Sequence, residues 1–361
     1  MLASFFKKSK GVLGNFSSFL ASDLAVDLGT ANIKIFVLGK GIQVKEPSCV
    51  ARNKKSKKIV AFGSEAKEML GKTPRQLEAF RPLKNGVIAD FDATEAILKF
   101  YLDKVKVPSS KSSLQQILAR LGKPKVIIGI PSGVTEVERM AVKEVALEAG
   151  AREAFLIEQV LASAVGAKLP VLNSQGTMMV DIGGGTTEVA VIAIGGIVVS
   201  RSIRSAGDEM DEAIRHFCRL KYSLLLGIQS AEKVKIAVGS AFASSKERHT
   251  VVRGRDLETG LPRSVRLSEG EIREAITPVI LNIIQAIKEA VEETPPELIG
   301  DVMEGAITLA GGGSLLSGLP QRIAQETKIP TILAEHPETS VVRGAAKILE
   351  TKELFEKAVV G

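Results

Sequence analysis

Residues 24–42 read LAVDLGTANIKIFVLGKGI, and residues 178–197 read MMVDIGGGTTEVAVIAIGGI. Each stretch holds an apolar run, then Asp, an aliphatic residue and Gly, then small or hydroxyl residues, and then a run rich in β-branched residues. This pattern predicts a strand, a tight turn and a second strand. One such segment alone is more often an ordinary turn, but two widely separated copies indicate a duplicated core with a shared purpose.

The two turns have the composition of phosphate-binding loops. Gly29 in the first copy and residues 183–185 in the second lack a Cβ, which lets consecutive backbone N–H groups approach a phosphate. Asp27 and Asp181 each close a first strand and are placed to meet Mg²⁺, through water because this ion keeps much of its hydration shell. Two such hairpins facing each other would hold a polyphosphate between two domains. The single-loop motif GxxxxGKS/T does not occur in the sequence.

A third glycine cluster follows the strand-like run at residues 306–309. Gly311, Gly312 and Gly313 precede Leu315 in a turn that leads into a predicted helix. Taken alone, this is equally well a tight strand-to-helix turn. Beside two phosphate hairpins, it suits close backbone approach to adenine or ribose.

Composition limits the classes of protein that the chain can belong to. Its 361 residues fit about two domains, and 45 % hydrophobic with 25 % charged residues excludes collagen-like and disordered chains. Cys49 and Cys218 make no disulfide framework and lack metal-ligand spacing with the three histidines, which favours a reducing compartment. The net charge of +7 calls for an anionic partner. Aromatic residues, at 4 %, are too scarce for a single-stranded nucleic-acid surface, so we expect no nucleic-acid partner.

The N-terminal segment, MLASFFKKSKGVLGNFSSFLASD, has the pattern of an in-plane membrane anchor. Its lysines at positions 7, 8 and 10 lie outside an apolar helical face and interrupt the apolar run, which argues against a secretory signal. No apolar stretch in the segment approaches the roughly 20 residues that a membrane span needs. A helix packed on the protein's own body, or a frayed tail, would fit the same pattern. We expect residues 1–22 to bind a membrane through Leu2, Phe5, Phe6, Leu13, Phe16 and Phe19.

A second basic and apolar segment lies at about residues 104–124. Leu114, Ile117, Leu118 and Leu121 recur at helical spacing, and lysines and an arginine surround them. The segment either packs on the first domain or provides a second membrane contact through Leu114 and Leu118.

The chain resembles the actin, heat-shock chaperone and sugar kinase ATPase superfamily, and within it the MreB family of bacterial actin homologues. The resemblance runs from about residue 23 to residue 349. The run RPLKNGVIAD at 81–90 and GDEMDEA at 207–213 separate this family from the chaperones. The family's other signatures follow in order at residues 27–32, 46–48, 71–74, 130–139, 181–188, 232 with 235, and 311–316.

The resemblance implies an α/β fold: an actin-like two-domain ATPase with a duplicated core, holding ATP and Mg²⁺ in the interdomain cleft. It places domain I at residues 23–173, with a small subdomain at about 52–86 and the inserted loop at about 104–124. Domain II would span residues 174–349, with a small subdomain at about 207–268, and residues 350–361 would form a C-terminal tail. The implied nucleotide-binding residues are Gly29, Thr30, Ala31, Asn32, Gly183, Gly184, Gly185, Thr187, Gly207, Asp208, Glu232, Lys235, Gly311, Gly312, Gly313 and Leu315. Glu232 and Lys235, three residues apart on a predicted helix, could instead be a surface pair.

One departure from the family concerns hydrolysis. The family carries a water-activating glutamate before a proline, whereas alignment on the following small residues places Gln159 and Val160 there. A glutamine cannot take a proton at neutral pH, but it can orient water. Glu158 is aimed differently and is a weak substitute. We expect a weak ATPase, faster in the filament, with Gln159, Asp181 and Thr186 as its catalytic residues.

The resemblance implies a cytoplasmic protein on the inner face of the cell membrane. It would polymerise into filaments, as antiparallel double protofilaments, and organise cell-wall synthesis and rod shape. The implied partners are further copies of the chain, the anionic membrane surface, and the membrane elongation proteins RodZ, MreC and MreD. The main alternative is a degenerate filament protein that binds ATP without appreciable hydrolysis. A sugar or acetate kinase, or a division-type actin relative, fits less well.

Overall fold

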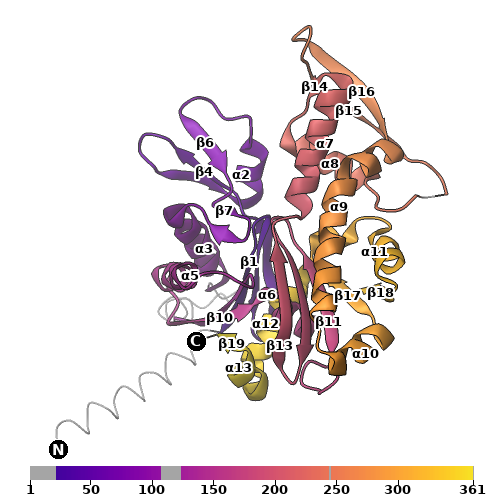
Figure 1. The fold of residues 1–361 in the computed structure, drawn as a ribbon. Helices are drawn as coiled ribbons and strands as arrows, with labels where there is room; N and C mark the ends of the chain where they lie inside the picture. The colour runs from indigo at the N-terminus through magenta and orange to yellow at the C-terminus, as the bar shows by residue number, and fades with distance from the viewer. Residues whose placement is uncertain (1–21, 107–122, 244, 361) are drawn as a thin grey trace, which may run out of the picture.

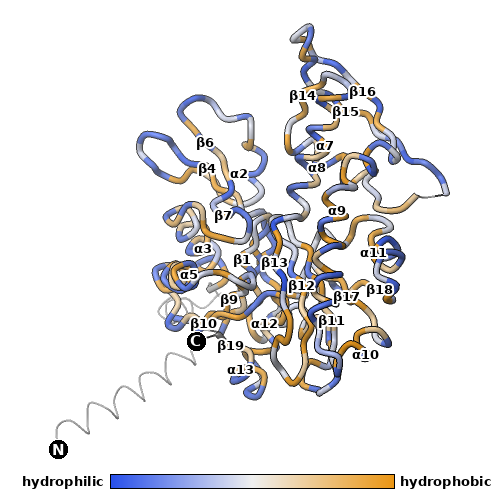
Figure 2. Tube along the Cα trace, in the orientation of Figure 1, coloured by the Kyte–Doolittle hydropathy of each residue, from blue (hydrophilic) through white to orange (hydrophobic). Residues whose placement is uncertain are grey.

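The computed structural model describes residues 22–106, 123–243 and 245–360. Two α/β domains lie side by side, and each carries a small subdomain at the same end of the molecule (Figure 1). Apolar stretches follow the strands of the two main sheets and the helices beside them, whereas the loops of the small subdomains include long polar stretches (Figure 2). No helix in these described ranges is apolar and long enough to cross a bilayer.

The two main sheets repeat one strand arrangement. In the first sheet, β1 (Leu24–Leu28) pairs antiparallel with β2 (Asn32–Val37) and parallel with β9 (Lys125–Ile130). In the second, β11 (Thr177–Ile182) pairs antiparallel with β12 (Thr187–Ala193) and parallel with β17 (Ile307–Ala310). The duplicated sequence therefore folds into duplicated hairpins at equivalent places.

The remaining strands extend these two arrangements. The first sheet has the order β19-β10-β9-β1-β2-β3 and the second the order β13-β12-β11-β17-β18. β1 is buried along its whole length, as expected for a central strand covered on both faces. The other bounds are β3 (Gly41–Pro47), β10 (Glu153–Glu158), β19 (Val359–Val360), β13 (Gly196–Ile203) and β18 (Thr331–Leu333).

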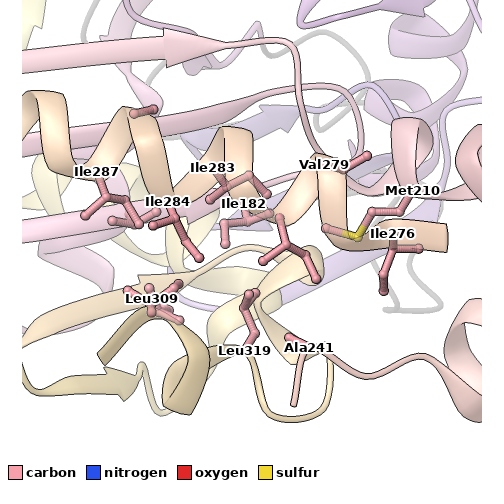
Figure 3. Close-up of a cluster of buried hydrophobic side chains, with 14 of the residues drawn as sticks. Ile182, Met210, Ala241, Ile276, Val279, Ile283, Ile284, Ile287, Leu309 and Leu319 are labelled. Carbon is pink, nitrogen blue, oxygen red and sulfur yellow. The ribbon is translucent and has the colours of Figure 1, made fainter. Parts of the chain in front are cut away.

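Outer helices cover the far face of each sheet. The first sheet packs on α3 (Phe91–Lys106) and α5 (Glu136–Glu148), whose N-terminus is closed by a capping box between Thr135 and Glu138. The second packs on the long helix α9 (Glu269–Glu292), which points isoleucines toward Ile182 and Leu309 (Figure 3). Two shorter helices beside the second sheet are α10 (Pro296–Glu304) and α11 (Leu319–Thr327).

Each small subdomain is built around a three-stranded sheet. The first contains β4 (Val50–Asn53), β5 (Ile59–Phe62), α2 (Gly63–Met69), β6 (Leu77–Phe80) and the hairpin of β7 (Leu83–Lys84) and β8 (Val87–Ile88). The second contains α7 (Gly207–Tyr222), β14 (Leu224–Leu225), α8 (Ile228–Val238), β15 (His249–Asp256) and β16 (Pro262–Ser268).

Helices α6 (Gln159–Gly166) and α12 (Ser340–Glu350) lie between the two main sheets. One apolar cluster joins them to both sheets, with Ile127 and Ile157 from the first sheet and Met179 and Ile192 from the second. The two helices cross at Gly166 and Gly344, where a Cβ on either glycine would overlap backbone atoms of the other helix. The domains are thus held together by a dry contact that only small residues permit.

The C-terminal residues return to the first sheet. We expected a tail at residues 350–361, but the chain there forms α13 (Lys352–Ala358) and β19. β19 pairs antiparallel with β10, so residues 359–360 add an edge strand to the first sheet. Tertiary pairing of a very short strand carries no periodic signal in sequence, which is why the pattern there suggested only a polar tail.

We predict that Gly344→Ala lowers the urea midpoint and the free energy of unfolding, by at least about 1–3 kcal/mol, because its methyl group would overlap the Ala162 carbonyl and force α6 and α12 apart. Urea unfolding monitored by circular dichroism measures this. Gly300→Ala on α10 is the matched control: a Cβ there meets open space, so the change should be neutral or stabilising by up to about 1 kcal/mol. Equal stability of Gly344→Ala and wild type would contradict the prediction.

Candidate functional site

A cleft between the two domains gathers most of the predicted site residues. It is lined by both hairpin turns, by the glycine turn after β17 and by the starts of α6 and α7. The predicted residues that line it are Asp27, Gly29, Thr30, Ala31, Asn32, Gln159, Asp181, Gly183, Gly184, Gly185, Thr186, Gly207, Asp208, Glu232, Lys235, Gly311, Gly312 and Gly313.

Two predicted residues do not line this cleft. Thr187 is fully buried, and its hydroxyl donates to the backbone oxygen of Ser205. Leu315, at the end of η1 (Gly312–Leu315), is half exposed outside the cleft. All eight predicted membrane residues fall outside the part of the chain that the structure describes: Leu2, Phe5, Phe6, Leu13, Phe16, Phe19, Leu114 and Leu118.

The two hairpin turns touch each other across the cleft. A Cβ on Gly184 would lie 2.6 Å from the Ala31 Cβ, and one on Gly185 would lie 2.7 Å from the Thr30 hydroxyl oxygen. The same Thr30 hydroxyl accepts a 2.9 Å hydrogen bond from the Gly86 N–H. Glycine is therefore required at both positions for the domains to approach this closely.

The start of α7 is fastened to the second hairpin. The Asp208 N–H donates to the Gly184 carbonyl at 2.7 Å, and α7 runs sixteen residues from Gly207. Its positive N-terminal end therefore faces the cleft, an arrangement that favours an anion. The third turn packs against the second hairpin, where a Cβ on Gly311 would overlap the Ile182 carbonyl: Gly311 has φ +80°, a left-handed conformation that suits glycine, and its N–H donates to the Pro337 carbonyl. Pro337 begins η2 (Pro337–Thr339).

Two buried carboxylates stand on the two hairpins. Asp27 and Asp181 both line the cleft and are less than a tenth exposed. Burial raises the pKa of Asp181 to about 6; the Ser163 hydroxyl donates to this carboxylate and opposes the rise, and the charge of Asp27 adds to it. A cation between the two carboxylates would relieve both effects.

These carboxylates fit Mg²⁺ held through water. Among the described residues, no three side chains of the types that bind metals converge here or elsewhere. An ion at Asp27 and Asp181 would therefore take its other ligands from water and phosphate, which suits Mg²⁺ because it prefers oxygen and keeps its hydration shell.

Lys34 on β2 is a cleft residue that we did not predict. Its Nζ lies 2.6 Å from the Asp27 Oδ2, and both side chains are largely buried. Burial acts to lower the pKa of Lys34, but the hydrogen-bonded Asp27 and the charges of Asp181 and Glu338 raise it overall. A lysine in a strand of otherwise apolar alternation was the available signal.

Gly86 and Asp211 stood in the quoted runs at 81–90 and 207–213 without being assigned to the site, and tertiary contacts bring the other unpredicted residues to the cleft. Lys45 on β3 forms an ion pair with Glu338, and Asp211 on α7 pairs with Lys235 at 2.8 Å. The unpredicted lining residues are Lys34, Lys45, Gly86, Asp211, Ile236, Pro337, Glu338 and Val341.

Two predicted nucleotide-binding carboxylates bridge the cleft in this structure. Asp208 accepts from Arg81 at 2.7 Å with both carboxylate oxygens, and Glu232 accepts from Lys67 at 2.9 Å. The Lys235 ammonium donates to the Gly207 carbonyl at 2.6 Å. Glu232 and Lys235 thus have separate partners and are not a surface pair with each other.

Gln159, rather than Glu158, faces the cleft. Gln159 is the first residue of α6 and packs against Gly129, whose missing Cβ leaves room for it. Glu158 does not line the cleft and accepts a 2.6 Å hydrogen bond from the Ser132 hydroxyl. Thr186 lines the cleft opposite Gln159, on the second hairpin.

Glu188 is a buried acid just behind the second hairpin. It accepts from the Ser132 N–H at 3.0 Å, across the domain boundary, and from the Ser202 hydroxyl at 2.7 Å. Burial raises its pKa to about 7, although these two hydrogen bonds oppose the rise.

Comparison with known proteins agrees with this geometry. The family model described as "MreB/Mbl protein" matches residues 21–357. The chain is 45 % identical to the cell shape-determining protein MreB of Escherichia coli (strain K12) over 343 residues, which covers 94 % of this chain and 96 % of that protein.

Solved structures show the same fold. MreB5 of Spiroplasma citri, in a crystal structure bound to ADP, superposes with a TM-score of 0.85 at 36 % identity, covering 93 % of this chain and 98 % of that one. A second crystal structure of MreB5 holds AMPPNP. The MamK double helical filament matches with a TM-score of 0.74 at 22 % identity, covering 91 % of this chain and 99 % of that one. The actin-like two-domain fold expected from the sequence is confirmed.

We predict that Glu188→Gln raises the free energy of unfolding at pH 8 by up to about 3 kcal/mol. Folded Glu188, with its pKa raised to about 7, keeps its proton up to about that pH, whereas an unfolded glutamate releases it near the ordinary pKa of 4.5. The folded state therefore binds more protons between these two pH values, so Glu188 lowers stability as pH rises through that window. Glutamine, which is always neutral, removes this loss.

Urea unfolding of nucleotide-free protein in EDTA, from pH 4.5 to 8, measures the difference. The gain from Glu188→Gln should grow with pH and be near zero at pH 4.5. Glu144→Gln on the exposed face of α5 is the control and should follow wild type throughout. A pH-independent difference between Glu188→Gln and wild type would contradict the prediction.

Proposed function

Since this chain belongs to the MreB/Mbl family, we propose that it binds ATP with Mg²⁺ in the interdomain cleft and assembles into filaments. The single observation that carries the proposal is the contact between the two glycine hairpins, Gly184 against Ala31 and Gly185 against Thr30. Because of that contact, the backbone N–H groups of both hairpin turns line one cleft, and the N-terminus of α7 lines it as well. The ADP and AMPPNP bound to MreB5 support a nucleotide as the ligand.

Different residues of the cleft would contact the phosphates, the Mg²⁺ ion and the nucleoside. The backbone of the two hairpin turns would hold the phosphates, and Asp27 and Asp181 would hold Mg²⁺ through water. When bound, this ion supplies positive charge that offsets the phosphate oxygens. Asp208, Glu232 and Lys235 would face the ribose and adenine, with the glycine turn at residues 311–313 on the other side.

Hydrolysis would be slow because the cleft offers a poor base. Gln159 can orient a water molecule beside Thr186, but its amide cannot accept a proton at neutral pH. Filament assembly would speed hydrolysis if it holds Gln159 against that water. The same residue favours the second candidate function, a filament protein that binds ATP and does not hydrolyse it appreciably.

An exposed apolar strip on α5 suits contact between copies of the chain. Val137 and Met140 are 77 % and 62 % exposed, and Leu147 lies on the same side of the helix at 47 %. Exposure of such apolar side chains to water is unfavourable, and association with another copy of the chain would bury them. We place one filament contact here, in line with the self-assembly that the resemblance implies, as antiparallel double protofilaments.

The membrane role depends on sequence alone. Residues 1–22 pair apolar side chains with lysines, which suits the anionic inner face of the cell membrane. From that position the filament would organise cell-wall synthesis and rod shape; the E. coli relative is named a cell shape-determining protein. RodZ, MreC and MreD remain partners proposed by resemblance.

We predict that the full chain pellets in the presence of ATP and Mg²⁺, and that it also pellets with anionic liposomes. Val137→Glu should reduce pelleting at least about tenfold, because it places a charge in the α5 contact. Ultracentrifugation and electron microscopy of the same samples measure it. Leu281→Glu on α9, also exposed and apolar, is the matched control and should pellet like wild type. A wild-type protein that stays in solution under all conditions would overturn the proposed assembly.

We predict that Gln159→Glu raises phosphate release by filaments at least about tenfold, because a carboxylate can accept a proton from the attacking water. A coupled phosphate assay on pelleted and unpelleted protein measures it. Gln159→Ala should release less phosphate than wild type while still binding nucleotide. Unchanged release by Gln159→Glu would show that Gln159 does not contact the reacting water.

A further inference from the structure

The cleft carries more negative than positive charge before any nucleotide enters. Six described carboxylates line it: Asp27, Asp181, Asp208, Asp211, Glu232 and Glu338. Three described lysines line it: Lys34, Lys45 and Lys235. A polyphosphate brought into this space meets like charge unless a cation compensates it.

Two of the three lysines pair with carboxylates other than Asp27 and Asp181, although Lys45 on β3 is the register partner of Lys34. Lys235 is held by Asp211 and by the Gly207 carbonyl on the side of the second small subdomain. Lys45 pairs with Glu338 and is half exposed at the rim. Among the lysines that the structure places at the cleft, Lys34 is the one beside Asp27.

The backbone fixes Lys34 in this position. β2 alternates, with Ile33, Ile35 and Val37 buried in the outer core of the first sheet. Lys34 therefore points to the opposite face of the sheet. Phe36, on that same face, packs against the interdomain cluster. Lys34 is also the direct register partner of Asp27 in the β1–β2 ladder, so the pair does not depend on a mobile loop.

Lys34 has hydrogen-bond donors left over after its ion pair with Asp27, and these donors can bind a phosphate. Its ammonium group has three N–H donors, and Asp27 accepts one of them. Only Leu28 separates Asp27 from the turn that begins at Gly29, and Lys34 lines the same cleft as that turn, so its ammonium group is near the proposed phosphate loop. The charge is fixed there whether or not a metal ion is bound.

We propose that Lys34 is a phosphate-binding cation that holds the nucleotide polyphosphate together with, and partly in place of, Mg²⁺. This inference rests on the proposed nucleotide site. It adds Lys34 to that site, together with nucleotide binding that persists without Mg²⁺. Nucleotide affinity should then survive removal of Mg²⁺ to an extent that Lys34 determines. Its positive charge, rather than its contact with Asp27, is the required feature.

Calorimetric titration of the full chain with ADP and with AMPPNP, in excess Mg²⁺ and in excess EDTA, tests this. In wild type, EDTA should weaken binding by less than about tenfold. In Lys34→Gln, which can still donate to Asp27 but lacks the charge, EDTA should weaken binding by a further factor of about 10–100. Lys34→Arg, which keeps the charge, should behave like wild type.

Lys40→Gln is the matched control because Lys40 is exposed in the turn that links β2 to β3 and does not line the cleft. It should leave both affinities unchanged. Circular dichroism checks that each variant is folded, and Lys34→Met replaces Lys34→Gln if the latter is not.

The outcomes separate this inference from the proposed function. Absence of ADP and AMPPNP binding in wild type with Mg²⁺ would overturn the nucleotide site itself. Binding with Mg²⁺ that disappears in EDTA for wild type would overturn the role of Lys34 without any variant. An equal EDTA effect in wild type and Lys34→Gln would overturn it as well, because the pair with Asp27 would then be only structural.

Discussion

The crossing of α6 and α12 is the contact on which the rest of the molecule depends. Gly166 and Gly344 let two helix backbones touch, and this sets how near the two sheets can come. Only at that distance do the hairpin turns meet, with Gly184 against Ala31 and Gly185 against Thr30. Packing in the dry core therefore determines the geometry of a polar cleft, because close-packed interiors transmit displacement instead of absorbing it.

Charge sets the second constraint. The cleft buries acids that burial alone would protonate, and Asp181 and Glu188 have raised pKa values for this reason. Partners supplied by other elements offset the cost: Ser163 from α6, Lys34 from β2 and Ser132 from the loop after β9. These contacts stabilise the buried acids, but the cleft still has more negative than positive charge. A polyphosphate that brings a metal cation with it is therefore favoured over one without a cation.

The parts of the site that could be predicted from sequence are those built within a few residues. The turns at Gly29, Gly183 and Gly311 each follow a short apolar run, and their chemistry is local, so pattern alone located them. Lys45 and Glu338 reach the cleft from separate elements, and no spacing rule links them, whereas Asp211 stood in the run at 207–213, three residues after Asp208 on the same helix. The contact of Arg81 with Asp208 is likewise tertiary, although both residues stood in recognised motifs. The strand β19 was missed because two residues are too few to show a period.

The path of the chain restricts how the two domains can move. The polypeptide passes from the first sheet to the second through α6, and it returns through α12 to β19. Both connections therefore run through the same pair of packed helices, side by side between the sheets. Because the two connections are adjacent and packed on each other, a rotation of one domain relative to the other would take place about this pair of helices. The small subdomains lie far from α6 and α12 (Figure 1), so such a rotation would displace them more than the strands beside these helices.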